Sequence, residues 1–283
     1  MNALAATHRW GLARFRDAFD VALSHRDRNL PPLAGRSVLE LPGAAGPLEG
    51  RLFRPAGVAA DAPILLYFHG GGFVCSSLDT HEALCVRLAH AGCLRVLAAS
   101  YRLAPEHRFP AQLEDALCVA RWLESQGQPF AVGGDSAGGY LAASVGARMP
   151  QAISGQLLLY PLVHLDDDVW AQSLLRHSRL IGWAAVRYIR AQLEGDAPSL
   201  LAPGALAALP TVIAAGGVLD PTREDALPLA ERLRAAGAPV TLREYPGFIH
   251  GFGNLTHVSA AARAAVAELG QLAGELARRA TVG

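Results

Sequence analysis

The sequence predicts an α/β fold in which a mostly parallel central sheet carries helices on both faces. Short apolar runs, such as PILLYFHGG at 63–71 and GQLLLYPLV at 155–163, alternate with longer stretches whose apolar residues recur at the helical period. Continuous apolar strands separated by helices are typical of parallel sheets that are buried on both faces. The chain has 283 residues, of which 51% are hydrophobic, so we expect one large domain spanning residues 1–283.

Six apolar runs are expected to form the strands of this sheet, and helices are expected between them. The runs begin near residues 63, 94, 130, 155, 209 and 240. The helical period appears at 80–92, 110–127, 137–149, 223–237 and from about Ser259 onward. We expect Pro228 to kink the fourth of these helices or to displace its start toward the C-terminus, because proline lacks the N–H that the helix ladder needs.

Two segments do not follow this alternation. Near the N-terminus, Phe15, Phe19 and Leu23 recur at four-residue spacing ahead of any strand. Residues 166–195 contain two tryptophans and several aliphatic residues, with no strand among them. Open α/β sheets keep their sites at the carboxyl edge of the strands. We therefore expect segments at about 1–35 and 166–195 to form a small helical cap over that edge.

Composition and charge exclude several classes of function. All 25 basic residues are arginines, and 25 acidic residues balance them, so we expect no nucleic acid partner. The absence of lysine excludes Schiff-base and P-loop lysine chemistry. The four cysteines form no CxxC pair and lie in apolar stretches, so we expect buried thiols and no metal site. They are Cys75, Cys85, Cys93 and Cys118.

The N-terminal thirty residues lack the uninterrupted apolar stretch of a signal peptide. Charged side chains interrupt this region, among them Arg9, Arg14 and Asp17. No segment of the sequence has the length of charge-free apolar residues that a membrane span requires. We therefore expect a soluble, cytoplasmic protein with no membrane partner.

A serine stands at a strand-to-helix junction in the stretch GGDSAGGY at 133–140. The strand expected at 130 ends here and a helix follows, so Ser136 lies at the centre of a G-x-S-x-G turn. Such a turn holds the serine in a strained backbone conformation, and side chains two residues before or after it would collide. The pattern predicts that Ser136 is a nucleophile held at the carboxyl edge of the sheet.

A serine nucleophile needs a base and an orienting acid, which accompany this motif in the chain order serine, acid, histidine. Asp220 directly follows the strand expected at 209, and His250 lies in a Gly-bracketed loop after the last strand. We expect Asp220 to be the acid and His250 the base. The alternative acids are Glu224, Asp225 and Asp166 to Asp168, and the alternative base is His257.

The glycine run in YFHGGGF at 67–73 ends the strand expected at 63. Residues without side chains let a substrate approach the backbone closely. We expect the backbone N–H groups of Gly70 and Gly71, together with that of Ala137, to stabilise the oxyanion of an acyl-transfer intermediate.

Five motifs occur in order along the chain. They are HGGGF at 69–73, YRLAPEHRFPA at 101–111, GDSAGG at 134–139, DP at 220–221 and YPGFIHGF at 245–252. As a set they resemble the hormone-sensitive-lipase-like carboxylesterases, the bacterial family IV of the α/β-hydrolase superfamily. The resemblance covers the chain from about Leu39 to the C-terminus. It implies an α/β-hydrolase fold and the hydrolysis of short- to medium-chain esters of small molecules without a cofactor.

The resemblance also implies roles for the residues around Ser136. Arg102 and Glu106 match a structural brace behind the site, and Asp135 matches a positioning residue. The chain departs from the family in having a tyrosine where asparagine is usual, DPTRED in place of DPLRDE, and a short span between Leu162 and Leu209. We expect three substrate-binding residues, Phe73, Tyr140 and Trp183.

The same residues would serve an amidase, an arylformamidase or a lactonase, because each of these enzymes transfers an acyl group to serine and then to water. A ligand receptor on the same fold is a further alternative, although such receptors resemble this family without the catalytic histidine. The oligomeric state stays open, with a homodimer as one alternative. The cap predicts an acyl pocket with an optimum at roughly four to eight carbons.

Overall fold

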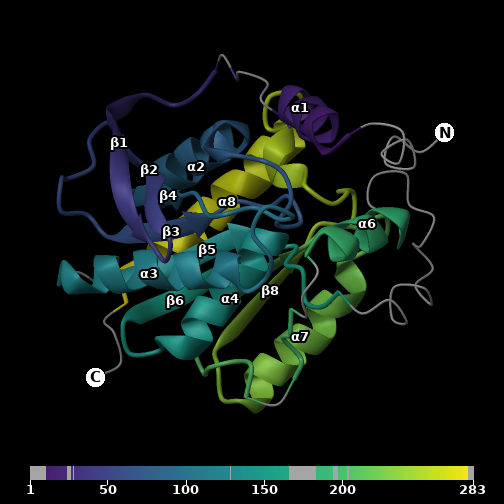
Figure 1. The fold of residues 1–283 in the computed structure, drawn as a ribbon. Helices are drawn as coiled ribbons and strands as arrows, with labels where there is room; N and C mark the ends of the chain where they lie inside the picture. Colours follow the sequence, from purple (N-terminus) through teal and green to yellow (C-terminus); the bar gives the residue numbers. More distant parts are fainter. Residues whose placement is uncertain are drawn as a thin grey trace.

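An eight-stranded sheet runs through the centre of the computed structural model, in the order β1-β2-β4-β3-β5-β6-β7-β8 (Figure 1). The structure describes residues 11–23, 27, 29–127, 129–165, 183–193, 197–202 and 204–279. The strands are β1 (Leu33–Gly43), β2 (Gly46–Pro55), β3 (Ile64–Phe68), β4 (Arg95–Ala99), β5 (Phe130–Asp135), β6 (Ile153–Leu159), β7 (Thr211–Ala215) and β8 (Val240–Glu244). β3 to β8 pair in parallel, whereas β2 is antiparallel to both β1 and β4. The prediction of a mostly parallel sheet is confirmed.

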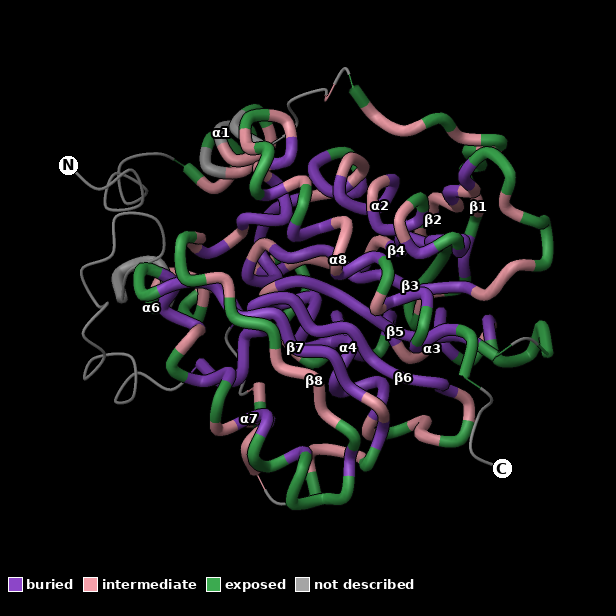
Figure 2. Tube along the Cα trace, turned by 180° about the vertical axis from the view of Figure 1, so that it is seen from behind, coloured by how far each residue is buried: buried purple, intermediate pink, exposed green. Residues whose placement is uncertain are grey.

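Helices cover both faces of the sheet. They are α1 (Leu12–Leu23), α2 (Leu78–Gly92), α3 (Ala111–Ser125), α4 (Ala137–Arg148), α6 (Trp183–Leu193), α7 (Arg223–Ala235) and α8 (Ala260–Ala277), with a short 3-10 helix η1 (Phe252–Leu255). Apolar residues of α2 and α8 pack on one face, and those of α3, α4 and α7 pack on the other. Figure 2 shows the resulting buried core along the central strands.

Strand β3 shows how the continuous apolar runs divide between the two cores. Leu66 and Phe68 point into the core beneath α3 and α4, whereas Leu65 and Tyr67 point into the core beneath α2 and α8. Successive side chains of a strand face opposite sides of the sheet. A strand covered on both sides therefore has to be apolar at every position, as the sequence of β3 is.

The hairpin of β1 and β2 was not among the six expected strands. It lies at the edge of the sheet, where many of its side chains reach solvent, and Val38 is 67% exposed. A half-exposed antiparallel ribbon needs no continuous apolar run. The signal that revealed the buried strands is therefore weak over residues 33–55.

Helix α7 runs from Arg223 to Ala235 with Pro228 inside it. The alternative in which Pro228 displaces the start of the helix is therefore wrong, and the kink stays a prediction. The missing N–H of a proline would leave the carbonyl four residues earlier without a helix partner. Here that carbonyl belongs to Glu224, which is an exposed residue within reach of water.

All four cysteines have free thiols. Cys75 and Cys85 are buried as expected and Cys118 is half-buried, but Cys93 is exposed, so the expectation is wrong there. Cys93 ends helix α2 in the left-handed conformation, with φ 47°. A residue that terminates a surface helix turns away from the core that the preceding residues of the helix face.

Both segments expected to form the cap contain a helix, α1 in the first and α6 in the second. The two helices lie at the same end of the molecule in both views (Figures 1 and 2). Most of 166–195 lies outside the described residues, so the cap as a whole stays a prediction. In the described ranges, no helix combines the length and the apolar character needed to cross a membrane.

Candidate active site

Ser136 lies at the sharp turn between β5 and α4. Its backbone has φ 51° and ψ −118°, a conformation that side-chain-bearing residues rarely adopt. A Cβ atom on Gly134 would overlap the backbone of Gly138, and one on Gly138 would overlap the carbonyl oxygen of Phe68. The turn therefore requires glycine on both sides of Ser136, for the steric reason that the sequence indicated.

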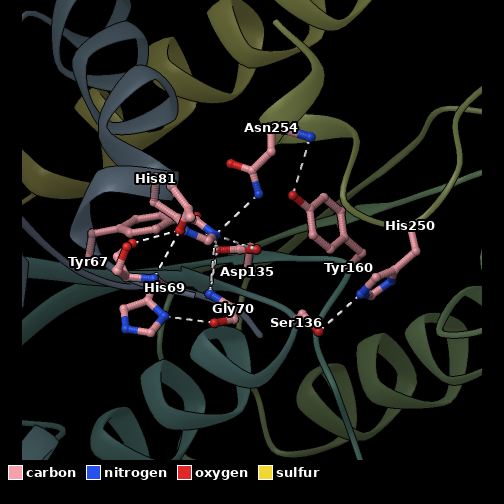
Figure 3. Close-up of polar contacts among 12 residues, drawn as sticks. Tyr67, His69, Gly70, His81, Asp135, Ser136, Tyr160, His250 and Asn254 are labelled. Carbon is pink, nitrogen blue, oxygen red and sulfur yellow. Dashed lines mark hydrogen bonds and ion pairs between the residues drawn. The ribbon is translucent and has the colours of Figure 1, made fainter. Parts of the chain in front are cut away.

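The structure brings Ser136, His250 and Asp220 together. The Oγ atom of Ser136 is 3.0 Å from Nε2 of His250, and Nδ1 of His250 is 2.9 Å from Oδ1 of Asp220 (Figure 3 shows the first contact). The side chains of His250 and Asp220 are 5% and 0% exposed. The three side chains thus form a continuous series of contacts within hydrogen-bond reach, in the order expected for a nucleophile, a base and an orienting acid.

The alternative residues that the structure describes lie elsewhere. Asp225 contacts a different histidine, with its Oδ1 atom 3.1 Å from Nε2 of His164. Glu224 is exposed, and no contact is found between His257 and Ser136 within the described part of the chain. Asp166 to Asp168 lie outside the described residues.

The carboxylate of Asp220 is completely buried, and its oxygens are unequally paired. Oδ1 accepts hydrogen bonds from the backbone N–H of Thr222 at 3.0 Å and from the Thr222 hydroxyl at 2.8 Å, besides its contact with His250. Oδ2 has no partner among the described residues. Burial favours the protonated acid, but His250 and the Thr222 donors hold the pKa of Asp220 below its ordinary value.

Thr222 is a residue of the site that the sequence reading did not single out. It stands at the start of helix α7, and its hydroxyl is also 3.3 Å from Nδ1 of His250. The signal was present, because a threonine two residues after an aspartate at a helix start is placed to bond the carboxylate.

The structure contradicts the predicted role of Gly70 as an oxyanion donor. Its N–H donates to Oδ1 of Asp135 at 3.0 Å, so it points at a buried carboxylate rather than toward Ser136 (Figure 3). The N–H groups of Gly71, Gly72 and Ala137 have no partner that we find in the described residues. Gly71 and Gly72 have φ values of 108° and 63°, in the region that favours glycine.

Asp135 connects the glycine-rich loop after β3, residues 69–76, to helix α2. Besides Gly70, its Oδ1 atom accepts from the Tyr67 hydroxyl at 2.9 Å and lies 3.2 Å from Nε2 of His81. Asn254, in η1 just after the His250 loop, places its Nδ2 atom 3.2 Å from the same nitrogen of His81 (Figure 3). Burial favours the neutral acid, but the charge and hydrogen bonds of His81 and Tyr67 keep the pKa of Asp135 below its ordinary value. These contacts agree with a positioning role for Asp135.

His69, which precedes the glycine run, is packed rather than reactive. Its ring stacks on Tyr101 with the ring centroids 4.4 Å apart, and its Nδ1 atom lies 2.7 Å from the carbonyl oxygen of Gly70. Burial, together with the neighbouring His81, lowers the pKa of His69 to about 4. The imidazole of His69 is therefore neutral near pH 7.

Two of the residues expected to bind substrate belong to a buried aromatic cluster. Phe73 and Tyr140 are 0% and 3% exposed, and their ring centroids lie 5.7 Å apart. Phe109 completes the cluster, and the Tyr140 hydroxyl donates to the carbonyl oxygen of Pro198 at 2.8 Å. Trp183 starts helix α6, but its side chain lies outside the described residues. Substrate contact by these three residues stays a prediction.

The YRLAPEH stretch acts as a brace. Nε of Arg102 donates to Oδ2 of the fully buried Asp115 at 2.8 Å. Glu106 instead reaches outward to Arg16 of α1, with oxygen–nitrogen distances of 2.7 Å. Neither Arg102 nor Glu106 has a described contact with Ser136, which agrees with structural rather than catalytic roles for both.

Comparison with known proteins identifies the family. The model of a family described as having the alpha/beta hydrolase fold matches residues 65–254. The chain belongs to this family. Esterase LipI of Mycobacterium tuberculosis is 35% identical over 236 residues, which cover 76% of this chain and 73% of LipI.

Two further similarities place this α/β hydrolase within the hormone-sensitive-lipase-like branch. The carboxylic ester hydrolase LipN of Mycobacterium tuberculosis is 36% identical over 82% of this chain and 68% of LipN. The crystal structure of a mutant of LAE6, an alpha/beta hydrolase enzyme from the metagenome of Lake Arreo in Spain, superposes with a TM-score of 0.84 and 30% identity, covering 94% of this chain and 90% of LAE6. The fold and the resemblance predicted from the motifs are confirmed.

Proposed function

We propose that this α/β hydrolase cleaves carboxylic esters of small molecules through an acyl-enzyme formed on Ser136. The observation that carries the proposal is the aligned pair of contacts, 3.0 Å from Ser136 Oγ to His250 Nε2 and 2.9 Å from His250 Nδ1 to Asp220 Oδ1. The esterase names of the relatives support the same chemistry.

In the first half of the reaction, Ser136 Oγ attacks the ester carbonyl carbon while Nε2 of His250 takes the hydroxyl proton. Asp220 holds the imidazole through Nδ1 and stabilises the positive charge that develops on the ring. When the tetrahedral intermediate collapses, the carbon–oxygen bond to the alcohol breaks, and the leaving oxygen takes the proton back from His250. The acyl group is then esterified to Ser136.

In the second half, a water molecule takes the place of the alcohol. His250 removes a proton from the water as the water oxygen attacks the acyl carbon, and it returns that proton to Ser136 Oγ when the ester bond to the enzyme breaks. The products are a carboxylic acid and the regenerated site. Besides the ester and the water, these steps use the side chains of Ser136, His250 and Asp220.

The negative oxygen of both intermediates needs preorganised donors. We assign this role to the N–H groups of Gly71, Gly72 and Ala137, with Gly72 in place of Gly70. The unpaired state of these three N–H groups within the described residues supports the assignment, as does the position of Ala137 at the first turn of α4. The positive end of that helix dipole also favours a negative oxygen there.

The acyl chain is proposed to lie under the helices of the cap. Each buried methylene contributes about 0.8 kcal/mol until the chain meets a wall, where overpacking reverses the gain. We expect an optimum at roughly four to eight acyl carbons. Measurement of kcat/KM for p-nitrophenyl esters from acetate to palmitate tests this, and a maximum at palmitate seen only above its solubility limit would indicate a lipase instead.

Covalent labelling tests the function itself. A fluorophosphonate probe should label the wild-type protein with a stoichiometry of about one and should fail to label Ser136→Ala, whose ester hydrolysis should fall by about 10⁴ or more with the fold intact. A ligand receptor would give no adduct in either protein. A panel of aryl esters, anilides, formamides and lactones then separates an esterase from an amidase, an arylformamidase and a lactonase.

A further inference from the structure

Arg16 reaches from helix α1 into the loops that surround the nucleophile. Its Nε atom donates to the carbonyl oxygen of Val74, and its Nη2 atom donates to the carbonyl oxygen of Ala104, each at 2.7 Å. Nη1 and Nη2 also donate to the two carboxylate oxygens of Glu106 at 2.7 Å each. One guanidinium thus joins α1 to two loops that lie 58 to 90 residues away along the chain.

The first of these loops carries the proposed oxyanion donors. Val74 lies two residues after Gly72, and the N–H of Val74 donates to the carbonyl oxygen of Gly71 at 3.1 Å, which closes the turn. Arg16 bonds the carbonyl of the same Val74 from the opposite side. A shift of Val74 is therefore transmitted directly to the peptide units that would face a substrate.

The second loop is bound to the first one at the same place. The N–H of Ala104 donates to the carbonyl oxygen of Phe73 at 2.9 Å. Arg16 bonds the carbonyl group of Ala104 and that of Val74, the residue after Phe73, so it contacts both loops beside this junction. The planar, five-donor guanidinium suits this set of acceptors, whereas a lysine ammonium carries its three donors on one nitrogen and cannot reproduce the fork.

The oxyanion loop is held in an unfavourable backbone conformation. Phe73 and Ser76 have φ values of 65° and 72°, which residues with side chains rarely adopt. Such conformations persist only where surrounding contacts determine them. The side chain of Ile189 from α6 packs against Gly72, and Arg16 supplies the polar contact from α1. Both helices of the expected cap therefore contact the loop.

Stability is a weak reason for this arrangement. The side chains of Arg16 and Glu106 are 23% and 51% exposed, and ion pairs so accessible to solvent contribute little to folding. The hydrogen bond with Glu106 nevertheless raises the pKa of Arg16 and lowers that of Glu106, so both groups stay charged near pH 7. Glu106 then orients the guanidinium, and its remaining donors reach the two carbonyl groups.

We propose that Arg16 is a positioning residue for acyl transfer, which acts through Val74 and Ala104 to hold the backbone donors Gly71 and Gly72 at the oxyanion. The proposal rests on the ester hydrolysis proposed above. It makes the N-terminal helix part of the catalytic apparatus, because α1 controls the geometry of the loop. A role in transition-state stabilisation should appear in kcat rather than in KM.

The test compares Arg16→Ala, Arg16→Lys and Glu106→Gln with Arg14→Ala, a matched control at an exposed position of the same helix. Arg16→Ala should lower kcat for p-nitrophenyl butyrate by about 10- to 100-fold, with KM changed by less than about threefold. It should weaken inhibition by an aliphatic trifluoromethyl ketone, which forms a tetrahedral adduct with an oxyanion, by about the same factor as kcat. Arg14→Ala should match the wild type in both measurements.

The remaining variants keep the test decisive. Arg16→Lys should recover only part of kcat, and Glu106→Gln should cost less than Arg16→Ala because the bonds to both carbonyl groups remain. Millimolar methylguanidine should partly restore kcat of Arg16→Ala by occupying the vacated place. If Arg16→Ala does not fold, Arg16→Lys decides by the same split between kcat and KM.

Two results would overturn the proposal. One is a kcat of Arg16→Ala, or of Arg16→Lys where the alanine variant does not fold, equal to that of Arg14→Ala. The other is a loss confined to KM with unchanged affinity for the ketone, which would make Arg16 an anchor of the helix only. Failure of the ester-hydrolysis proposal is distinguishable from both, because the wild type itself would then show no turnover and no fluorophosphonate adduct.

Discussion

Two buried histidine–carboxylate pairs lie near Ser136, and they differ in what their second ring nitrogen contacts. Figure 3 shows the pair of His81 and Asp135 and the contact of His250 with Ser136. In the pair of His250 and Asp220, Nδ1 faces the carboxylate and Nε2 lies 3.0 Å from Ser136 Oγ. In the pair of His81 and Asp135, both ring nitrogens are occupied by fixed groups. A histidine beside a buried acid becomes a base only where its other nitrogen meets a reactive group.

The contacts of His81 explain why its ring is structural. Nδ1 lies 2.8 Å from the Thr80 hydroxyl, and Nε2 is shared between Asp135 and Asn254. No ring nitrogen is left for a substrate hydroxyl or for water. His164 and Asp225 form a third pair of this kind, with 3.1 Å between Nε2 and Oδ1. Residue type and burial alone therefore do not distinguish catalytic from structural pairs.

Exchange of the two histidines for alanine should give the largest effects and opposite phenotypes. His250→Ala should lower kcat by about 10⁴ or more with little change in the free energy of unfolding. His81→Ala should leave measurable turnover but lower the free energy of unfolding by about 1–3 kcal/mol, because the buried carboxylate of Asp135 loses a hydrogen-bond partner. Steady-state kinetics and urea unfolding measure the two quantities, and equal losses of kcat in both variants would refute the distinction.

The carboxylates of Asp220 and Asp225 should differ in the same way, the first affecting turnover and the second stability. Asp220→Asn should lower kcat by about 10³ to 10⁴, because the amide favours the wrong imidazole tautomer and cannot stabilise the imidazolium. Asp225→Asn should reduce stability through the loss of the His164 contact while kcat stays within about threefold of the wild type. Glu224→Gln, at an exposed position, serves as the control for both. A severe loss of kcat in Asp225→Asn would reassign the acid.

Thr222→Val should have a smaller effect on turnover, through the proposed pair of Asp220 and His250. The valine keeps the shape of the side chain and the backbone N–H but removes the 2.8 Å hydroxyl bond to Asp220 Oδ1, so the pKa of Asp220 rises. We expect kcat/KM to fall by about tenfold, equivalent to about 1.4 kcal/mol. Thr222→Ser should restore most of the activity because it returns the hydroxyl, and unchanged kcat/KM in the valine variant would show that the hydroxyl is dispensable.

Acid denaturation should reveal the contribution of the Asp220 and Asp135 carboxylates to stability. This is the smallest of the expected effects. The folded-state pKa values of Asp220 and Asp135 lie below the ordinary value of 3.8, so their stabilising contribution is complete above that value and disappears as the pH falls through the folded-state pKa. Melting temperatures should therefore decline below about pH 4. Asp135→Asn should show a shallower decline than the wild type, and parallel curves would contradict the shift at Asp135.

Much of the fold and of the site could be predicted because the sequence patterns that indicate them are local. The buried strands are continuous apolar runs, and the turn around Ser136 requires glycines at fixed offsets. The ends of parallel strands meet at one edge of a sheet, so the order of Ser136, Asp220 and His250 along the chain indicated their approach. The hairpin over 33–55 could not be predicted because its half-exposed residues form a weaker apolar pattern.

The sequence by itself determined the alternation of strands and helices and the turn that carries Ser136, because both depend on steric and apolar patterns that neighbouring residues set. It also indicated Asp220 and His250, because residues that follow parallel strands meet at one edge of the sheet. The tertiary structure alone decided which glycine N–H groups are available, since Gly70 turns toward Asp135 only when β3 and β5 lie side by side. It also decided the place of Arg16, whose acceptors are 58 or more residues away in the chain. Contacts between such distant residues follow from how the elements pack, and no local pattern encodes them.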